Sequence, residues 1–235
     1  MITPDLHLKT CFVLDEAGRI VSTREPQATR GPLFILVRGL SSCAWGVRSD
    51  VPVKIAEELD RLARDEPPMS NFRNAPLHAE RYRSLLKNRI DEVSEAKVRE
   101  SAGPAFAFPD SLGDPGNVSV IEDEGILEPN FRGWMPGEIK AGCSPLLAIF
   151  ENGQPVSICF CARHSEVAAE AGVETVESHR GRGFGARVTA AWAMAVRASG
   201  RIPLYSTSWT NHASLVVARK LRLVPYASSW SLSDK

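Results

Sequence analysis

One stretch of the sequence, residues 170–186, brings together the residue types that bind phosphate. Three glycines recur there at every second position, where they free the backbone for unusual φ and ψ angles and let a ligand approach closely. Two arginines lie among them and add positive charge. These five residues are Arg180, Gly181, Arg182, Gly183 and Gly185.

The residues on either side of these glycines predict a strand before them and a helix after them. Val173, Thr175 and Val176 are β-branched and favour a strand. Apolar residues recur at helical spacing from Phe184 onward, and Gly200 is a stop signal for that helix. The unpaired N–H groups and the positive dipole end of a helix N-terminus attract phosphate. The sequence therefore predicts a strand, a phosphate-binding turn and a helix.

Three kinds of phosphate-binding turn compete for this stretch. The P-loop pattern Gly-x-x-x-x-Gly-Lys-Ser/Thr does not occur in the sequence. A dinucleotide-binding turn needs an acidic residue about twenty positions later, yet no Asp or Glu follows Glu177 until Asp234. The acyl-CoA pattern Arg/Gln-x-x-Gly-x-Gly/Ala matches residues 180–185 and needs no later acid. We therefore favour an acyl-CoA turn over a glycine-rich turn without a ligand.

The order of elements around this turn resembles the GNAT superfamily of N-acetyltransferases. The glycine turn is followed by a predicted helix, a predicted strand, and Asn-His-Ala-Ser at residues 211–214 on a second helix. The end of that helix resembles the family's Lys-Leu-Gly-Phe segment, although Arg222-Leu223 departs from its last pair. The resemblance covers residues 116–235.

The resemblance implies acetyl-CoA (CoA) as the cofactor. In this family the pyrophosphate rests on the glycine turn, and the pantetheine arm bonds the backbone of the preceding strand. The Asn and the Ser of the second helix are expected to contact the cofactor as well. The resemblance thus places CoA on Thr175, Val176, Arg180, Gly181, Arg182, Gly183, Phe184, Gly185, Ala186, Asn211 and Ser214.

Direct attack of an amine on the acetyl thioester needs a proton acceptor and a proton donor. Relatives often place a Glu or His on the strand before the turn. We expect Glu174 to be the base, because a carboxylate within an apolar strand is unusual. Glu170, at the start of that strand, is expected to be a solvated end residue. Relatives often carry a Tyr seven residues after the Asn, but Ala218 stands there, so Tyr205, a water or no acid at all must substitute.

The composition excludes several classes of partner. Lys and Arg number 28, as do Asp and Glu, so the net charge is zero and nothing global favours nucleic acid or a membrane. We expect a small-molecule or peptide amine as acceptor. Five cysteines without zinc spacing indicate a reducing cytoplasm and no metal site. The oligomeric state stays open, with a homodimer as one option.

We expect an α/β (α+β) fold in which a mixed, mostly antiparallel sheet is flanked by helices. The Pro-, Gly- and Asp-rich residues 109–117 predict a linker. It divides the chain into an N-terminal accessory α/β domain, residues 1–115, and a GNAT-like acetyltransferase domain, residues 116–235. The predicted strands are 6–14, 19–21, 33–37, 102–108, 118–121, 145–150, 156–161, 202–208 and 224–232, and the predicted helices include 76–90, 126–134 and 213–221.

These observations predict an acetyl-CoA-dependent N-acetyltransferase. A function of another class stays open, namely a non-catalytic acyl-CoA-binding module whose first half is an interaction domain. Such a module would keep the glycine turn and lack the usual Tyr, as Ala218 indicates. Release of free thiol from acetyl-CoA across a panel of amines separates the two.

Overall fold

The computed structural model describes residues 2–91 and 98–234. Within these ranges, nine strands form one sheet in the order β4-β3-β11-β5-β10-β9-β8-β7-β6, and a separate hairpin pairs β1 with β2. Every neighbouring pair in the large sheet is antiparallel except β10 and β9, which run parallel. The strands are β1 (Phe12–Leu14), β2 (Ile20–Thr23), β3 (Phe34–Gly39), β4 (Cys43–Val47), β5 (Arg99–Ala107), β6 (Ser119–Val120), β7 (Leu147–Glu151), β8 (Gln154–His164), β9 (Ala168–Thr175), β10 (Ile202–Ser206) and β11 (Val224–Ser233).

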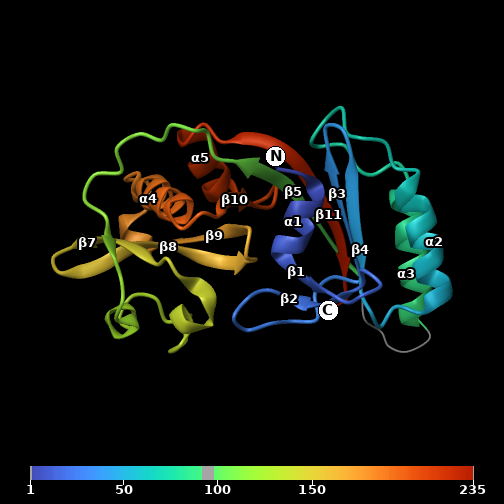
Figure 1. Ribbon diagram of the computed structural model, residues 1–235, viewed down its shortest axis with the longest axis horizontal. Coiled ribbons are helices and arrows are strands. Elements are labelled where there is room, and N and C mark those ends of the chain that lie inside the picture. The colour runs from blue at the N-terminus through green and yellow to red at the C-terminus, as the bar shows by residue number, and fades with distance from the viewer. Residues whose placement is uncertain (1, 92–97, 235) are drawn as a thin grey trace.

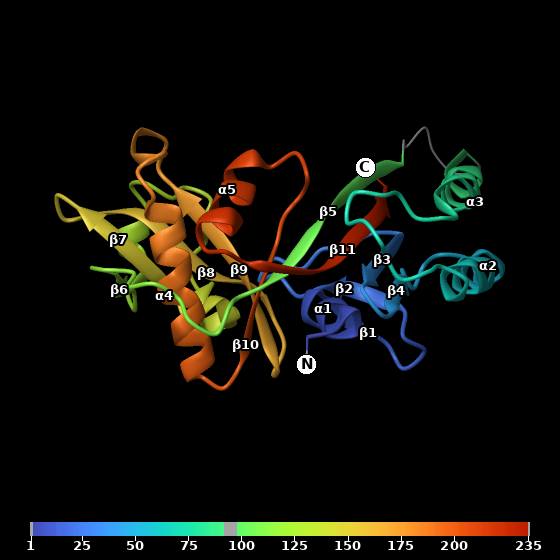
Figure 2. The ribbon, with the colours of Figure 1, turned by 90° about the horizontal axis from the view of Figure 1, so that it is seen from above.

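Helices flank this sheet at both ends, as Figures 1 and 2 show. The helices are α1 (Pro4–Cys11), α2 (Val53–Arg64), α3 (Ala79–Asp91), α4 (Phe184–Ala198) and α5 (His212–Lys220). α2 and α3 lie beside β3 and β4, whereas α4 packs on β7, β8 and β9. The expected fold class, a mixed and mostly antiparallel sheet flanked by helices, is confirmed.

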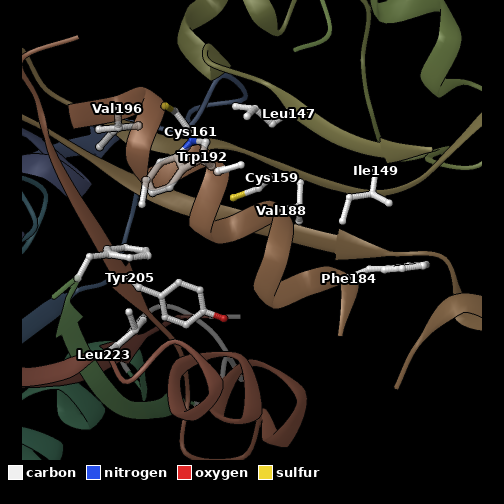
Figure 3. Packing of buried hydrophobic residues seen from close by; sticks show 14 of the residues in the cluster. Leu147, Ile149, Cys159, Cys161, Phe184, Val188, Trp192, Val196, Tyr205 and Leu223 are labelled. Atoms are coloured by element: carbon white, nitrogen blue, oxygen red, sulfur yellow. The ribbon is translucent and has the colours of Figure 1, made fainter. Parts of the chain in front are cut away.

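The sheet around α4 is buried on both faces, because its strands carry apolar side chains at successive positions and successive side chains point to opposite faces. Leu147 and Ile149 of β7 join the cluster around Trp192 of α4, which Figure 3 shows. Leu146 and Ala148 point to the opposite face and join a second cluster with residues from the segment 121–139. This segment therefore covers the face of the sheet that α4 leaves open.

Strand β11 lies inside the sheet although it comes last in the described chain. It pairs with β3 on one side and with β5 on the other, so that Leu232 stands opposite both Phe34 and Glu100. β5 also pairs with β10. Hydrogen-bonded strands thus join the parts of the chain before and after residue 115. The division of the chain into two domains at this residue stays a prediction.

The first predicted strand, residues 6–14, is wrong over most of its length, because residues 4–11 form α1. Thr3 caps this helix by accepting a hydrogen bond from the Leu6 N–H at 3.2 Å, and Pro4 occupies the favourable first turn. The apolar side chains of α1 pack against Ile35 and Val37 of β3. Capping and tertiary packing therefore outweigh the strand-like alternation of the sequence.

The predicted helix 126–134 is also wrong. The structure has a 3-10 turn, η1 (Glu124–Leu127), and further turns instead. Asp123 caps η1 by accepting from the Gly125 N–H at 3.0 Å. Pro129, Gly133 and Pro136 then interrupt any regular helix.

The remaining predicted elements agree with the structure within a few residues. The β7–β8 hairpin turns at Asn152 and Gly153, whose φ angles of 50° and 74° are both positive, as an Asn-Gly hairpin turn requires. No helix in the described ranges is long and apolar enough to cross a membrane.

Candidate active site

A cavity of about 800 Å³ opens where β9 and β10 separate. Over the described residues, β10 pairs with β9 only from Ile202 opposite Ala168 to Leu204 opposite Glu170. β9 continues to Thr175, and the N-terminal part of α5 stands on the other side of the gap. The end of β9, the glycine turn, the start of α4 and α5 together line the cavity.

β9 offers an open backbone edge to this cavity. On its other edge it pairs with β8 as far as Thr175, and the Val176 N–H donates to Val156 of β8 at 2.9 Å. Backbone groups of successive residues in a strand point to opposite edges. The N–H and C=O groups of Val173 and Thr175 therefore point away from β8, towards the gap that β10 has left.

The glycine turn presents free N–H groups at the start of α4. Gly181 and Gly183 have φ angles of 80° and 87°, a region that only glycine enters at low cost. The Arg187 N–H donates to Gly183 at 3.2 Å, so the N–H groups of residues 184–186 precede the helical hydrogen bonds. Phe184, Gly185 and Ala186 all line the cavity.

Gly185 lies at the start of α4 and faces both α5 and β9. A Cβ atom on Gly185 would stand 3.5 Å from Val217 of α5 and 3.6 Å from the Thr175 Oγ1. The side chains of Val173 and Thr175 thus face α4. Phe184 is buried and packs into the cluster of Figure 3.

The two arginines of the turn have different surroundings. Arg180 lines the cavity and donates through Nε to the Thr175 carbonyl at 3.1 Å. Arg182 instead pairs with Glu151, its Nη1 donating to the carboxylate at 2.6 Å, and its guanidinium lies 4.6 Å from the Phe184 ring centroid. Both arginines were predicted to contact CoA, but only Arg180 is among the residues that line the cavity.

Lys220, at the end of α5, is a candidate that the sequence analysis missed. Its Nζ lies 3.8 Å from the point that a Cβ atom on Gly183 would occupy, so the ammonium group stands beside the glycine turn. Lys220 also lines the cavity. The sequence signal for Lys220 is that it lies in the segment after Glu177, which contains several Arg and Lys residues and no Asp or Glu before Asp234. This signal does not distinguish Lys220 from the other basic residues of the segment.

Glu174 lies on the face of β9 opposite to α4, because its neighbours Val173 and Thr175 point towards α4. Its side chain is exposed to the cavity next to Asn130 and Phe131, and no described side chain pairs with it. Partial desolvation raises the pKa of Glu174, and the charge of Glu138 raises it further.

Glu170 is not the solvated end residue that we expected. Only 2% of it is exposed, and it accepts hydrogen bonds from Arg163 Nη1 at 3.0 Å and from Ser206 Oγ. Burial is the largest single influence and would raise the pKa of this carboxyl, but the charges of Arg163 and His7 and the hydrogen bonds from Ser206 and Arg163 together outweigh it and lower the pKa. Glu170 does not line the cavity, so this structure gives it no path to an amine there.

Tyr205 reaches the cavity from β10 although only 2% of the residue is exposed. Its hydroxyl donates to the Ser214 carbonyl at 3.2 Å, and Figure 3 shows the residue among the buried side chains near α4. Burial raises the pKa of Tyr205 to about 12, so the hydroxyl keeps its proton at neutral pH. Ala218 packs into the same apolar cluster.

Asn211 and Ser214 lie together at the start of α5. The Asn211 Oδ1 accepts from the Ser214 N–H at 3.1 Å, which makes Asn211 the N-cap of the helix. Both residues line the cavity. Of the predicted site residues, the structure thus brings all except Arg182 to the walls of one cavity.

Comparisons with known proteins bear on this region. The family model described as GNAT acetyltransferase matches residues 147–224. Among solved structures, the chain is similar to a GNAT-family acetyltransferase from Colwellia psychrerythraea, with 12% identity, a TM-score of 0.49, and 82% of this chain and 76% of that chain covered. It is also similar to a GCN5-related N-acetyltransferase-like protein from Streptococcus suis 89/1591, with 16% identity, a TM-score of 0.49, and coverage of 87% and 85%.

An aminoglycoside 6'-N-acetyltransferase complexed with coenzyme A is similar at 10% identity and a TM-score of 0.35, with 50% of this chain and 96% of that chain covered. No curated protein matches the sequence. The family match runs from β7 to the first residue of β11 and includes the open edge of β9, the glycine turn and α5. The expected resemblance to the GNAT acetyltransferases is thus confirmed over residues 147–224, which match the family model.

Proposed function

We propose that this protein is an N-acetyltransferase that transfers the acetyl group of acetyl-CoA to a primary amine by direct attack. The observation that carries this proposal is the open edge of β9, which ends in the glycine turn inside one cavity. A thioester cofactor needs both features together, a strand edge for its arm and an anion site for its pyrophosphate.

The pyrophosphate is proposed to rest on the N–H groups of residues 181–186. Arg180 and Lys220 supply the positive charge, because both side chains line the cavity beside the turn. The pantetheine amides would bond the backbone groups of Val173 and Thr175. A strand N–H in the same place would stabilise the oxyanion that forms when the amine attacks.

In the proposed reaction the amine nitrogen bonds to the acetyl carbon while the carbon–sulfur bond breaks. Glu174 accepts the proton that the amine loses, directly or through a water, and its raised pKa suits this role. Tyr205 donates its hydroxyl proton to the departing thiolate and regains one from solvent. The products are the acetylated amine and free CoA.

The acceptor is proposed to be a small-molecule or peptide amine, and the protein to act in the cytoplasm. All five cysteines are free, which suits a reducing compartment. The acceptor would enter from the side of Glu174, where Phe131 and Asn130 line the cavity.

The experiment measures free CoA thiol released from acetyl-CoA in the presence of a panel of primary amines, together with CoA binding by calorimetry. Amine-dependent thiol release supports the enzyme. Binding of CoA without release by any amine would instead support the non-catalytic acyl-CoA-binding module. The absence of CoA binding would overturn both proposals.

A further inference from the structure

Three buried side chains with metal-binding atoms meet outside the cavity described above, between α1 and β9. His7 and Cys11 lie one turn apart on α1, and Glu170 lies on β9. Their exposed fractions are 3%, 4% and 2%. One ligand atom from each residue lies within 4.8 Å of the other two.

The distances among these atoms suit a tetrahedral ion. Zinc binds sulfur at about 2.3 Å and nitrogen or oxygen at about 2.0–2.2 Å, which places its ligand atoms about 3.4–3.6 Å apart. The Cys11 Sγ lies 3.8 Å from the His7 Nε2 and 3.3 Å from the Glu170 Oε2. Small side-chain movements would therefore bring all three atoms onto one ion.

Each of two ligands is already held by a further partner, as is usual around metal sites. The His7 Nδ1 lies 2.9 Å from the Tyr226 hydroxyl, which leaves Nε2 facing Cys11. Ser206 donates to one oxygen of Glu170, and Arg163 donates to the other at 3.0 Å. These contacts fix the orientation of the imidazole ring and of the carboxylate.

The charges around the cluster leave room for a cation in spite of the nearby guanidinium. Arg163 pairs with Glu170 and also with Glu25, so two carboxylates face one positive charge. A divalent ion that displaces the thiol proton of Cys11 adds one net positive charge and balances the group. The displaced proton passes to solvent.

We propose that His7, Cys11 and Glu170 bind one divalent transition-metal ion, and that their nitrogen, sulfur and oxygen donors select zinc. These side chains supply three of the four ligands that zinc prefers. The role is structural, since the ion ties α1 to β9 at the residue where β9 loses its partner β10. This proposal is independent of the proposed acetyltransferase activity, and it replaces the sequence-based expectation of no metal site.

The test uses the full chain without a histidine tag, because a tag would bind metal itself. The protein is treated with a chelator, dialysed, and titrated with zinc chloride, and bound zinc is measured by mass spectrometry. We expect one zinc per chain. With free zinc at about 100 times its Kd, the Tm is expected to rise by about 5–10 °C.

Cobalt(II) titration shows whether a thiolate is a ligand, since tetrahedral cobalt with a thiolate ligand has intense charge-transfer absorption. We expect this absorption in the wild type and in C43S, because the Cys43 thiol donates to the carbonyls of Glu66 and Pro67 and is not part of the cluster of His7, Cys11 and Glu170. We expect C11S to lose the absorption, and E170Q to bind zinc at least tenfold more weakly.

The wild-type measurement decides the outcome even where a variant fails to fold. A wild-type chain that retains no zinc and shows no cobalt–thiolate absorption overturns the site. Loss of the absorption in C43S with its retention in C11S would also overturn it.

Discussion

Leu204 and Glu170 are the last residues that join β10 to β9 in the described sheet. Beyond this pair, the edge of β9 borders the cavity instead of a strand. The buried carboxylate of Glu170 accepts hydrogen bonds there from Arg163 and Ser206, so a charged group lies at the point where the two strands separate. The pairing of Leu204 with Glu170 thus marks the inner end of the β9 edge that is open to the proposed cofactor.

The first prediction concerns Gly183. G183V is expected to abolish CoA binding, because a β-branched side chain disfavours a φ angle of 87° and covers the N–H groups of the turn. Calorimetry with CoA measures the effect. G153V is the matched control, since Gly153 has a φ angle of 74°, has open space around it and is not among the residues that line the cavity.

Both variants are expected to lose similar stability, of about 1–2 kcal/mol, from backbone strain. Only G183V should lose CoA. Unchanged CoA affinity in folded G183V would rule out the turn as the pyrophosphate site.

The second prediction separates the two arginines of the turn. R180A and K220A are expected to raise the KM for acetyl-CoA several-fold with little change in kcat, because contacts to phosphate stabilise the ground state and the transition state alike. R182A should change KM less, since Glu151 already binds the Arg182 guanidinium away from the cavity. Steady-state kinetics at fixed ionic strength tests this order. A larger effect in R182A than in R180A and K220A would contradict it.

The third prediction concerns Glu174. E174Q is expected to lower turnover by about 10²–10⁴-fold at neutral pH, with nearly unchanged CoA affinity. Because the pKa of Glu174 is raised, activity of the wild type should increase with pH over a range above the ordinary value of 4.5. The difference between wild type and E174Q should shrink at high pH, where more of the amine is already neutral. Near-normal turnover of E174Q at every pH would place the base elsewhere.

The stability of E174Q provides the control for a merely structural role. A pKa that is higher in the folded state stabilises the fold below the unfolded-state pKa, and this contribution is lost as pH rises through the folded-state pKa. At neutral pH the ionised Glu174 therefore adds nothing to stability. E174Q should unfold at the same temperature as the wild type or higher, and a lower Tm would indicate a structural role instead.

The fourth prediction concerns Tyr205. Y205F is expected to lower kcat while the KM for acetyl-CoA stays similar, because the hydroxyl, with a pKa of about 12, is the proposed proton donor. The lost hydrogen bond to Ser214 should cost about 1 kcal/mol of stability. Y82F is the control, since Tyr82 packs against Phe34 and Trp230 outside the cavity. Equal kcat values in Y205F and the wild type would remove Tyr205 from the mechanism.

The parts of the fold that the sequence predicts are those with local signals. Asn152-Gly153 specifies its own hairpin, and the glycine turn before α4 combines residues adjacent in the chain. The burial of Glu170 was not predictable in this way, because its partners come from β8, β10 and α1. The orientation of Arg182 likewise depends on Glu151, 31 residues away. Local sequence patterns therefore do not predict the surroundings of site residues whose partners are distant in the chain.

The central place of β11 has a consequence for biosynthesis. A chain leaves the ribosome from its N-terminus, so β3, β4 and β5 emerge long before residues 224–233. Until β11 arrives, one edge of β3 and one edge of β5 lack the strand that covers both in the finished sheet. Such edges pair readily with other chains. Nascent chains stalled before residue 224 are therefore expected to depend on chaperones more strongly than the completed protein does.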